Sequence, residues 1–348
     1  MNPYVLTILL SSLGLGTTLT FASSHWLLAW MGLEINTLAI LPLMAQQHHP
    51  RAVEATTKYF LTQATAAAMI LFAATTNAWT TGEWDINNLA HPLASALTIT
   101  ALALKVGLAP MHFWMPEVLQ GLDLTTGLIL STWQKLAPFA LIMQVAPNTN
   151  PTLLTTLGLL STLIGGWGGL NQTQLRKILA YSSIAHMGWM IIILQYTPQL
   201  TLIALGLYIF MTSAAFLSLK LASATKINTL TATWSKSPVL TATTAMALLS
   251  LGGLPPLTGF MPKWLILQEL TKQDLPITAT IMALAALLSL YFYLRLCYAM
   301  TLTISPNTTN ATTPWRIQTT QTTFALAVMS TAALGLLPLT PAIMALVV

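Results

Sequence analysis

The chain carries very little charge: Asp, Glu, Lys and Arg make up only 6% of its 348 residues. Soluble globular domains contain about 25% charged residues, so this composition excludes an ordinary soluble enzyme. Hydrophobic residues make up 55% of the chain, and a membrane-spanning helix needs about 20 of them in succession. We therefore expect a polytopic membrane protein. Its 13 Lys and Arg residues are scattered along the chain, which favours membrane-flanking loops over a nucleic-acid partner.

Cysteine is almost absent as well, since Cys297 is the only one. One thiol cannot build a disulfide framework, an iron–sulfur cluster or a Cys-based zinc site. The chain has no dinucleotide-binding fingerprint. The glycines of 165–169 follow no strand pattern, so they indicate either a close helix-packing face or the end of a span. No basic stretch precedes the first apolar run, so neither a signal peptide nor a transit peptide is indicated. We expect that run to be a retained span.

Apolar runs separated by polar or proline-containing breaks divide the chain into about eleven spans. Their approximate bounds are 3–21, 25–45, 52–79, 91–121, 124–146, 150–170, 173–195, 199–223, 238–271, 276–302 and 322–346. The predicted fold is an all-α polytopic membrane protein with two five-helix repeats, 1–147 and 148–302. A polar linker and a C-terminal transmembrane helix follow in 303–348.

Basic residues are unevenly divided between alternate loops. Lys272 is the only one on one side, whereas the other side, which includes the N-terminus, holds Arg51, Lys58, Arg176, Lys177, Lys220, Lys226, Lys236, Arg295 and Arg316. The positive-inside rule then predicts that the N-terminus lies on the positive side and the C-terminus on the opposite side. The N-x-T matches at Asn307 and Asn310 fall on the positive side, so we do not expect glycosylation there.

Two stretches read almost as copies: GLAPMHFWMPE, 107–117, and GLPPLTGFMPK, 253–263. Each lies in the fourth span of its block, and an odd number of spans per block makes the two blocks an inverted repeat. Proline removes a backbone donor, and freed backbone groups at membrane depth must be buried in protein or line water. Each break therefore predicts a polar cavity, with a simple kink in a packed helix as the alternative.

Four charged side chains fall within predicted spans: Glu34, Lys105, Lys135 and Lys263. A charge at the bilayer centre costs about 2.5–3.5 kcal/mol unless it is paired or hydrated. Glu34 is the only acidic residue in a span centre, so we expect it to pair with Lys105. A Glu–Lys pair whose distance or hydration changes is a switchable proton site. Snorkelling to an interface is the alternative, and Lys263 is the most open to it.

Two histidines also lie at depth: His112 in the first break and His186 in LAYSSIAHMGWMIII. Histidine titrates near neutral pH, which suits a proton relay. An imidazole bonded to a backbone carbonyl explains each of them equally well. The other four, His25, His48, His49 and His91, fall near span ends.

Five stretches together resemble a known family over the full length of the chain. They are MNPYVLTILLSSLGLGTTLTFASSHWLLAWMGLEINTLAILPLM, KVGLAPMHFWMPEVLQG, STWQKLAPFAL, LRKILAYSSIAHMGWM and LSLGGLPPLTGFMPKW. The chain is similar to the antiporter-like subunits in the proton-pumping arm of vertebrate mitochondrial NADH–ubiquinone oxidoreductase, respiratory complex I. The resemblance implies the mitochondrial inner membrane, with the N-terminus in the matrix and the C-terminus in the intermembrane space.

The same resemblance implies where the cofactors of the complex lie and which partners this chain has. NADH, FMN, iron–sulfur clusters and ubiquinone are expected in other subunits, with no cofactor or metal in this chain. Its partners would be neighbouring antiporter-like and small hydrophobic chains of the membrane arm, together with phospholipids such as cardiolipin. Larger relatives have additional spans, and this chain resembles a form without the first three.

The resemblance also implies relay roles for the six candidate residues. These are the Glu–Lys pair of the first half-channel (Glu34, Lys105), the central relay (Lys135), the lysine of the second half-channel (Lys263) and two polar positions on the connecting axis (His112, His186). The leading function is proton translocation, driven by a redox reaction elsewhere in the assembly. An autonomous cation/proton antiporter and a purely structural membrane spacer are the alternatives.

Overall fold

The computed structural model describes residues 2–46, 48–235, 237–303 and 323–347. The chain divides into two compact units, Met1–Ser161 and Thr162–Val348. The predicted boundary between the repeats, near residue 147, stays a prediction. Several residues of the predicted positive side and the linker lie outside the described residues: Lys236, Asn307, Asn310 and Arg316.

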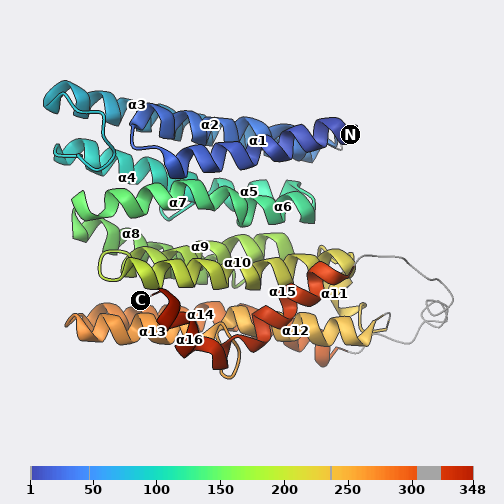
Figure 1. Ribbon diagram of the computed structural model, residues 1–348. Helices are drawn as coiled ribbons and strands as arrows, with labels where there is room; N and C mark the ends of the chain where they lie inside the picture. The colour runs from blue at the N-terminus through green and yellow to red at the C-terminus, as the bar shows by residue number, and fades with distance from the viewer. Residues whose placement is uncertain (1, 47, 236, 304–322, 348) are drawn as a thin grey trace. The chain divides into compact units, whose positions relative to one another are not determined.

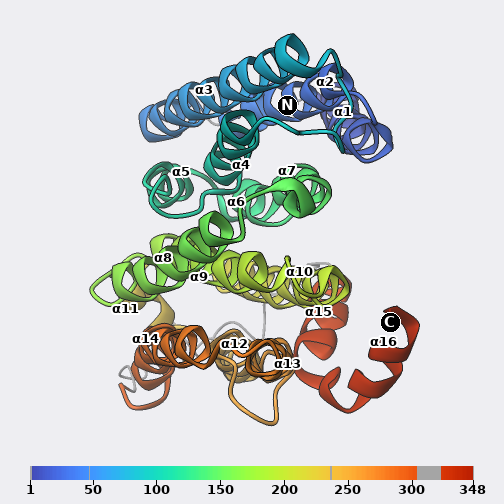
Figure 2. The same cartoon turned by 90° about the vertical axis from the view of Figure 1, so that its left-hand side faces the viewer.

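The first unit is built from helices that run close to parallel or antiparallel to one another (Figure 1). They are α1 (Pro3–Ala22), α2 (Trp26–Met44), α3 (Pro50–Thr81), α4 (Pro92–Val106), α5 (Trp114–Gly121), α6 (Leu124–Ser131), α7 (Trp133–Val145), the 3-10 turn η1 (Ala146–Asn148) and the first part of α8 (Pro151–Gly168). The adjacent helices α1, α2 and α3 pack side by side, and α3 also packs against α4 and α5 (Figure 2).

Glycine allows α1 and α2 to approach closely. A Cβ atom added to Gly16 would lie 2.8 Å from the carbonyl oxygen of Gly32, and one added to Gly32 would lie 2.8 Å from the oxygen of Gly16. Small residues at such contacts are the usual means of packing helices in lipid, where hydrophobic association is weak. This contact holds the part of α2 that carries Glu34 and Asn36 against α1.

Histidines begin three helices of this unit. His25, His49 and His91 are the N-cap residues of α2, α3 and α4, and the Nδ1 atom of each accepts a hydrogen bond from a backbone N–H of the first turn. The first four N–H groups of a helix lack helical partners, and a capping side chain satisfies one of them. The predicted place of these three histidines near span ends is confirmed.

The second unit contains the rest of α8 and the following helices. They are α9 (Leu175–Ile193), α10 (Pro198–Leu221), α11 (Ile227–Thr231), α12 (Pro238–Gly252), α13 (Phe260–Lys272), α14 (Pro276–Thr301), α15 (Phe324–Gly335), the 3-10 turn η4 (Leu337–Leu339) and α16 (Thr340–Val347). Within this unit α10 packs against α9, α12, α13 and α15, and α14 packs against α12 and α13 (Figure 2).

The glycines of 165–169 lie at close contacts in the second unit, as predicted. A Cβ atom on Gly165 would lie 2.7 Å from the backbone nitrogen of Ala185 in α9, and one on Gly166 would lie 2.9 Å from Cβ of Leu288 in α14. Larger side chains at these positions would push the neighbouring helices away.

Six helical segments among the described residues are long and apolar enough to cross a membrane, or seven if the bent pair α15 and α16 is one span. The helices α4 and α12 are apolar but shorter, with 15 residues each. Each of them ends at one of the two proline breaks and is followed by a second short helix, α5 or α13. The all-helical membrane fold is thus as predicted, whereas the total of eleven spans stays a prediction.

Candidate functional site

Two of the predicted lysines line one cavity in the first unit. Lys105 lies in the last turn of α4 and Lys135 in the first turn of α7, with exposed fractions of only 6% and 2%. The same cavity is lined by the side-chain amides of Asn36, Gln63 and Gln134. It leaves about 10 Å³ for the centre of a water molecule, which is room for about one water.

Several polar atoms around this cavity have no hydrogen-bond partner within the described parts of the chain. They are Nζ of Lys105, both amide atoms of Asn36 and Nε2 of Gln63. A buried polar group left without a hydrogen bond costs about 1–3 kcal/mol, and buried water is the usual partner of such groups. The arrangement is therefore that of a small chamber, lined by two lysines, whose buried polar groups are suited to hydrogen-bond a water molecule.

Glu34 lies beside this chamber but does not line it. Its neighbours Leu33 and Asn36 contribute to the lining, while its Oε2 atom is buried and has no hydrogen-bond partner among the described residues. Glu34 interacts electrostatically with Lys105 and with Tyr59. The ion pairs of the described residues do not include Glu34 with Lys105, so the expected pair interacts through space and its functional role stays a prediction.

His112 lies in the first break, where the chain turns between α4 and α5. Its ring is buried, its Nδ1 atom is 3.3 Å from the carbonyl oxygen of Pro110, and its centroid is 4.4 Å from that of Phe113. His112 is not among the residues that line the cavity. Both the relay and the structural interpretation of this histidine stay open.

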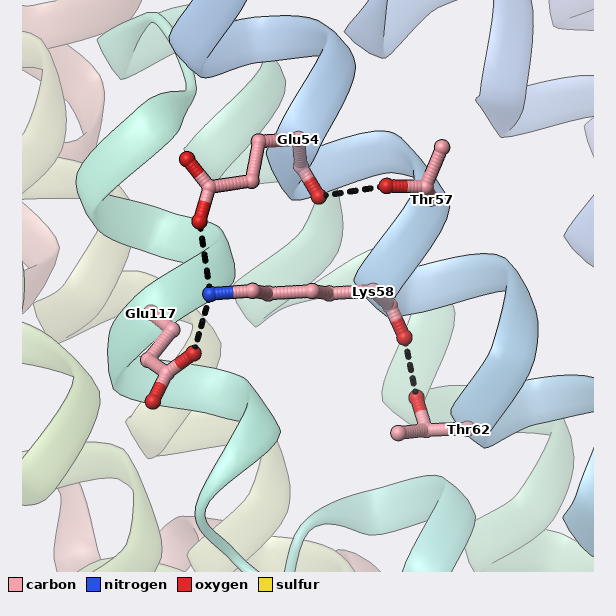
Figure 3. Close-up of polar contacts among 5 residues, drawn as sticks. All are labelled: Glu54, Thr57, Lys58, Thr62 and Glu117. Atoms are coloured by element: carbon pink, nitrogen blue, oxygen red, sulfur yellow. Dashed lines mark hydrogen bonds and ion pairs between the residues drawn. The ribbon is translucent and has the colours of Figure 1, made fainter.

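The charge at the end of the first motif, Glu117, lies outside the chamber. Its Oε2 atom is 2.7 Å from Nζ of Lys58 on α3, and the same ammonium is 2.8 Å from Oε1 of Glu54 (Figure 3). These side chains are exposed. The pair ties α5 to α3 at the surface, so the charges that end the two motifs, Glu117 and Lys263, are not equivalent.

In the second unit Lys263 lies in the first turn of α13, directly after the break. Its side chain is half-buried, and its ammonium donates a 2.7 Å hydrogen bond to the carbonyl oxygen of Gly252, the last residue of α12. The Lys263 side chain runs across Gly253, where an added Cβ would lie 2.8 Å from its Cδ atom. The backbone carbonyl at the end of α12 thus binds the ammonium group of Lys263.

His186 is also in the second unit, on α9. It is buried, its Nδ1 atom is 2.7 Å from the carbonyl oxygen of Ser182, and its ring centroid is 5.6 Å from that of Tyr208. A carbonyl oxygen can only accept a hydrogen bond, so Nδ1 carries the hydrogen and Nε2 is the acceptor of the neutral ring.

The sequence prediction missed the amides of the chamber. Asn36 lies two residues after Glu34, Gln134 directly precedes Lys135, and Gln63 lies on α3. Burying an amide side chain at membrane depth costs free energy, but uncharged polar residues in a span also occur at ordinary helix contacts, so the sequence alone did not single these amides out. Among the described residues no group of His, Cys, Asp and Glu is arranged to hold a metal ion.

Comparisons with known proteins match one family over nearly the whole chain. Residues 23–289 match the family described as NADH:quinone oxidoreductase/Mrp antiporter, transmembrane, and 290–344 match the family described as NADH dehydrogenase subunit 2 C-terminus. NADH-ubiquinone oxidoreductase chain 2 of Formosania lacustris is 90% identical, and that of Carassius auratus is 82% identical; each alignment covers 99% of both chains. A chain of respiratory complex I from Thermus thermophilus, solved with bound aureothin, is 30% identical with a TM-score of 0.85, over 98% of this chain and 80% of that one.

Proposed function

This chain belongs to the NADH:quinone oxidoreductase/Mrp antiporter transmembrane family, and from that premise we propose that its two lysine sites carry protons through the membrane. It is an antiporter-like membrane-arm subunit of the proton-translocating NADH:ubiquinone oxidoreductase. This identity favours a coupled subunit over an autonomous cation/proton antiporter. Electron transfer takes place in other subunits, which are expected to hold the NADH, FMN, iron–sulfur clusters and ubiquinone.

One observation carries the proposal: Lys105 and Lys135 line the same small polar cavity, where buried amides offer hydrogen bonds to water. A buried ammonium is stable only where a carboxylate or water compensates for its lost hydration. When the Glu34 carboxylate lies close, it favours the protonated form of Lys105. When Glu34 moves away or becomes hydrated, Lys105 gives its proton to water in the chamber, and Lys135 takes it up.

Lys263 is the corresponding group of the second unit. Its ammonium is held by one backbone carbonyl, and loss of that contact favours release of the proton to the far side of the membrane. Reloading of Lys263 from the positive side completes the cycle. We assign relay roles to His112 in the first unit and to His186 in the second.

The test is the substitution Lys105→Met in the assembled oxidoreductase, reconstituted into sealed vesicles. Methionine is nearly as long as lysine but cannot carry a proton. We expect NADH-driven proton translocation to fall by at least about 100-fold, the lower range for loss of a proton-transfer group. The matched control is Lys58→Met, which changes an exposed lysine of the same unit.

Normal translocation by a fully assembled Lys105→Met complex would contradict the proposal and favour the structural-spacer reading. Normal translocation is also the expected result for Lys58→Met. Blue-native electrophoresis of both variants, run beside the flux measurement, separates loss of transport from loss of assembly.

The number of membrane spans, their arrangement and the orientation of the chain in the membrane are part of the same proposal. We place about eleven spans in the mitochondrial inner membrane, as two inverted five-helix repeats and a C-terminal helix, with the N-terminus in the matrix. The basic residues at the ends of α9 and α10 and at the start of α11 support this orientation: Arg176, Lys177, Lys220 and Lys226. These side chains also suit anionic phospholipids such as cardiolipin, because basic groups next to a span attract acidic headgroups.

A further inference from the structure

Asn36 of α2 carries a buried amide at the chamber of the first unit. The residue is 2% exposed, and neither Oδ1 nor Nδ2 forms a hydrogen bond with any residue that the structure describes. A polar side chain that joins two helices in lipid usually forms a hydrogen bond across to the neighbouring helix, and a buried amide without a partner costs free energy. Helix packing alone therefore does not explain the amide of Asn36.

Neighbouring helices fix the position of Asn36 from two sides. A Cβ atom added to Gly16 of α1 would lie 2.8 Å from Cγ of Asn36, so the amide fills space that this glycine leaves open. From α7, Nε2 of Gln134 donates a 3.3 Å hydrogen bond to the backbone carbonyl oxygen of Asn36. Asn36 is therefore held between α1 and α7, at a point where it lines the chamber.

The other polar atoms without a partner at the chamber are donors. Nζ of Lys105 and Nε2 of Gln63 are buried and form no hydrogen bond within the described ranges, and both residues line the chamber with Asn36. An ammonium and an amide nitrogen only donate hydrogen bonds, so Oδ1 of Asn36 is the acceptor in this set. The space of about 10 Å³ holds about one water molecule, and a water molecule can accept from the two donors while it donates to Oδ1.

We propose that Asn36 is the positioning residue for the water molecule through which Lys105 exchanges its proton. The proposal rests on the proton-carrying function proposed above and names a residue that acts through this water rather than by carrying charge. Asn36 itself neither gains nor loses a proton.

An amide suits this position because it both donates and accepts hydrogen bonds. While Lys105 is an ammonium, it donates to the water, and the water donates to Oδ1 of Asn36. When Lys105 is a neutral amine, it accepts from the water, and Nδ2 of Asn36 donates to the water oxygen. A carboxylate would stabilise only the charged form of Lys105, and an apolar side chain would hold the water in neither state.

The proton transfer balances with one water molecule. The Lys105 ammonium gives a proton to the water oxygen, and the water gives one of its own hydrogens to the neutral amine of Lys135, which lines the same chamber. Lys105 ends neutral, Lys135 ends as an ammonium, and the water is restored. The other hydrogen of the water stays directed at Asn36 throughout, and the same steps reversed load Lys105.

The first test is Asn36→Leu in the assembled oxidoreductase, reconstituted into sealed vesicles. Leucine is similar in size to asparagine but forms no hydrogen bond. We expect coupled proton translocation to slow by about fivefold or more, the change that corresponds to one lost hydrogen bond. The solvent deuterium isotope effect on translocation should also change, which a purely structural role would not produce.

The matched control is Asn77→Leu, which removes another buried amide of the same unit. Asn77 is 0% exposed, donates a 3.0 Å hydrogen bond from Nδ2 to the carbonyl oxygen of Asn88, and does not line the chamber. Per assembled complex, Asn77→Leu should translocate protons at the normal rate with a normal isotope effect. If Asn36→Leu behaves like this control, Asn36 does not position the water.

Two further substitutions of Asn36 decide the question if the leucine variant does not assemble. Asn36→Asp keeps the shape of the side chain but adds a charge that holds the proton on Lys105, so it should slow translocation by about fivefold or more. Asn36→Ser keeps one donor and one acceptor and should be faster than Asn36→Asp. Normal translocation by Asn36→Asp, which a purely structural role predicts, would overturn the proposal.

Gly16→Ala displaces the amide of Asn36 without changing that residue. Its control is Gly32→Ala, whose Cβ atom would lie 2.7 Å from Cγ2 of Thr20 and 2.8 Å from the carbonyl oxygen of Gly16. Both substitutions disturb the contact of α1 with α2, but the close contacts of the added Cβ include Asn36 only at Gly16. Gly16→Ala should therefore translocate protons more slowly than Gly32→Ala, and equal rates would count against the role of Asn36.

Lys105→Met, measured in parallel, separates this proposal from the proposed function. Normal translocation by Lys105→Met would refute the function, whereas its loss together with normal translocation by Asn36→Leu would refute only the positioning role. A high-resolution structure of the native assembled complex is the direct check. It should show a water molecule within hydrogen-bond distance of the Asn36 amide and of Nζ of Lys105, and a chamber without that water would overturn the proposal.

Discussion

The two proline breaks have the same backbone and different chemistry. Gly107 and Gly253 end α4 and α12 in the left-handed region, with φ of 86° and 79°, and each is followed within three residues by a cis X-Pro bond. The lysine of the first unit, Lys105, precedes its break, whereas that of the second, Lys263, follows it. The two breaks thus share a backbone conformation, but the lysine lies before the break in the first unit and after it in the second.

The carbonyl groups freed at the two breaks are also used differently. In the first unit the indole of Trp114 donates a 3.0 Å hydrogen bond to the carbonyl oxygen of Leu104, and the nearby ammonium of Lys105 is left for a carboxylate and for water. In the second unit the Lys263 ammonium itself bonds the helix end. Under the proposed function, the protonated state of Lys105 depends on Glu34 and on hydration, whereas that of Lys263 depends on the carbonyl group of Gly252.

Acidic residues sharpen the contrast. Glu34 lies beside the chamber of the first unit, but the sequence of the second unit holds only Glu269 and Asp274. Glu269 is near the C-terminal end of α13, 3.5 Å from Nζ of Lys272. A carboxylate close to the candidate lysine is therefore a feature of the first unit, and under the proposed function a redox-linked movement would act there.

The largest effect is expected from replacing the lysine of the second unit. Lys263→Met should reduce coupled translocation by at least about 100-fold, the same loss expected for Lys105→Met, because both lysines are proposed to act in series. The measurement is proton uptake per NADH oxidised in vesicles, with the exposed Lys272→Met as the control. If Lys263→Met keeps normal stoichiometry while Lys105→Met loses it, the two units are not steps of one path.

A smaller effect, on one unit only, is expected from Glu34→Gln. The amide keeps the shape of the side chain but no longer stabilises the Lys105 ammonium, and we expect translocation to fall by about tenfold. Glu269→Gln, which changes an acid of the second unit away from its lysine, should have no such effect. Equal rates for the two variants would remove the contrast between a carboxylate-switched unit and a backbone-held one.

Substitutions of the two left-handed glycines compare the breaks through stability. Alanine in this backbone region costs about 1–2 kcal/mol, so Gly107→Ala and Gly253→Ala should both lower the melting temperature of the subunit in the complex. Gly253→Ala should be the worse of the two, because its Cβ would lie 2.8 Å from the Lys263 side chain, against 3.2 Å from Sδ of Met115 at Gly107. It should also slow translocation, and an unchanged rate would show that the Lys263 contact is dispensable.

The smallest effect is expected at the surface ion pair of α3 and α5. Lys58 and Glu117 are exposed, and such pairs contribute little because water and salt screen them. Glu117→Gln should leave translocation unchanged and lower the melting temperature slightly at low salt, with no difference at high salt. A loss of translocation as large as that of Lys105→Met would instead place Glu117 in the path.

Much of the candidate site could be predicted because charge at membrane depth is conspicuous. Lys105, Lys135 and Lys263 stand out in apolar runs, and all three are buried or half-buried. The amides of Asn36 and Gln63 could not be placed in the same way, because an uncharged polar residue in a span also occurs at ordinary helix contacts. The expected contact of Glu34 with Lys105 is an interaction through space, a distance that no sequence pattern encodes.

The sequence by itself determined that this is a helical membrane protein with two breaks of one kind. These properties are local: hydrocarbon tolerates only apolar side chains with satisfied backbone groups, and glycine and proline set the backbone where they stand. Only the tertiary structure decided which polar groups share a cavity. Asn36, Lys105 and Lys135 come from three helices far apart in the chain, and they meet because each helix turns one particular face toward its neighbours. That orientation results from packing all the helices of the unit together. The sequence of a single span does not determine it.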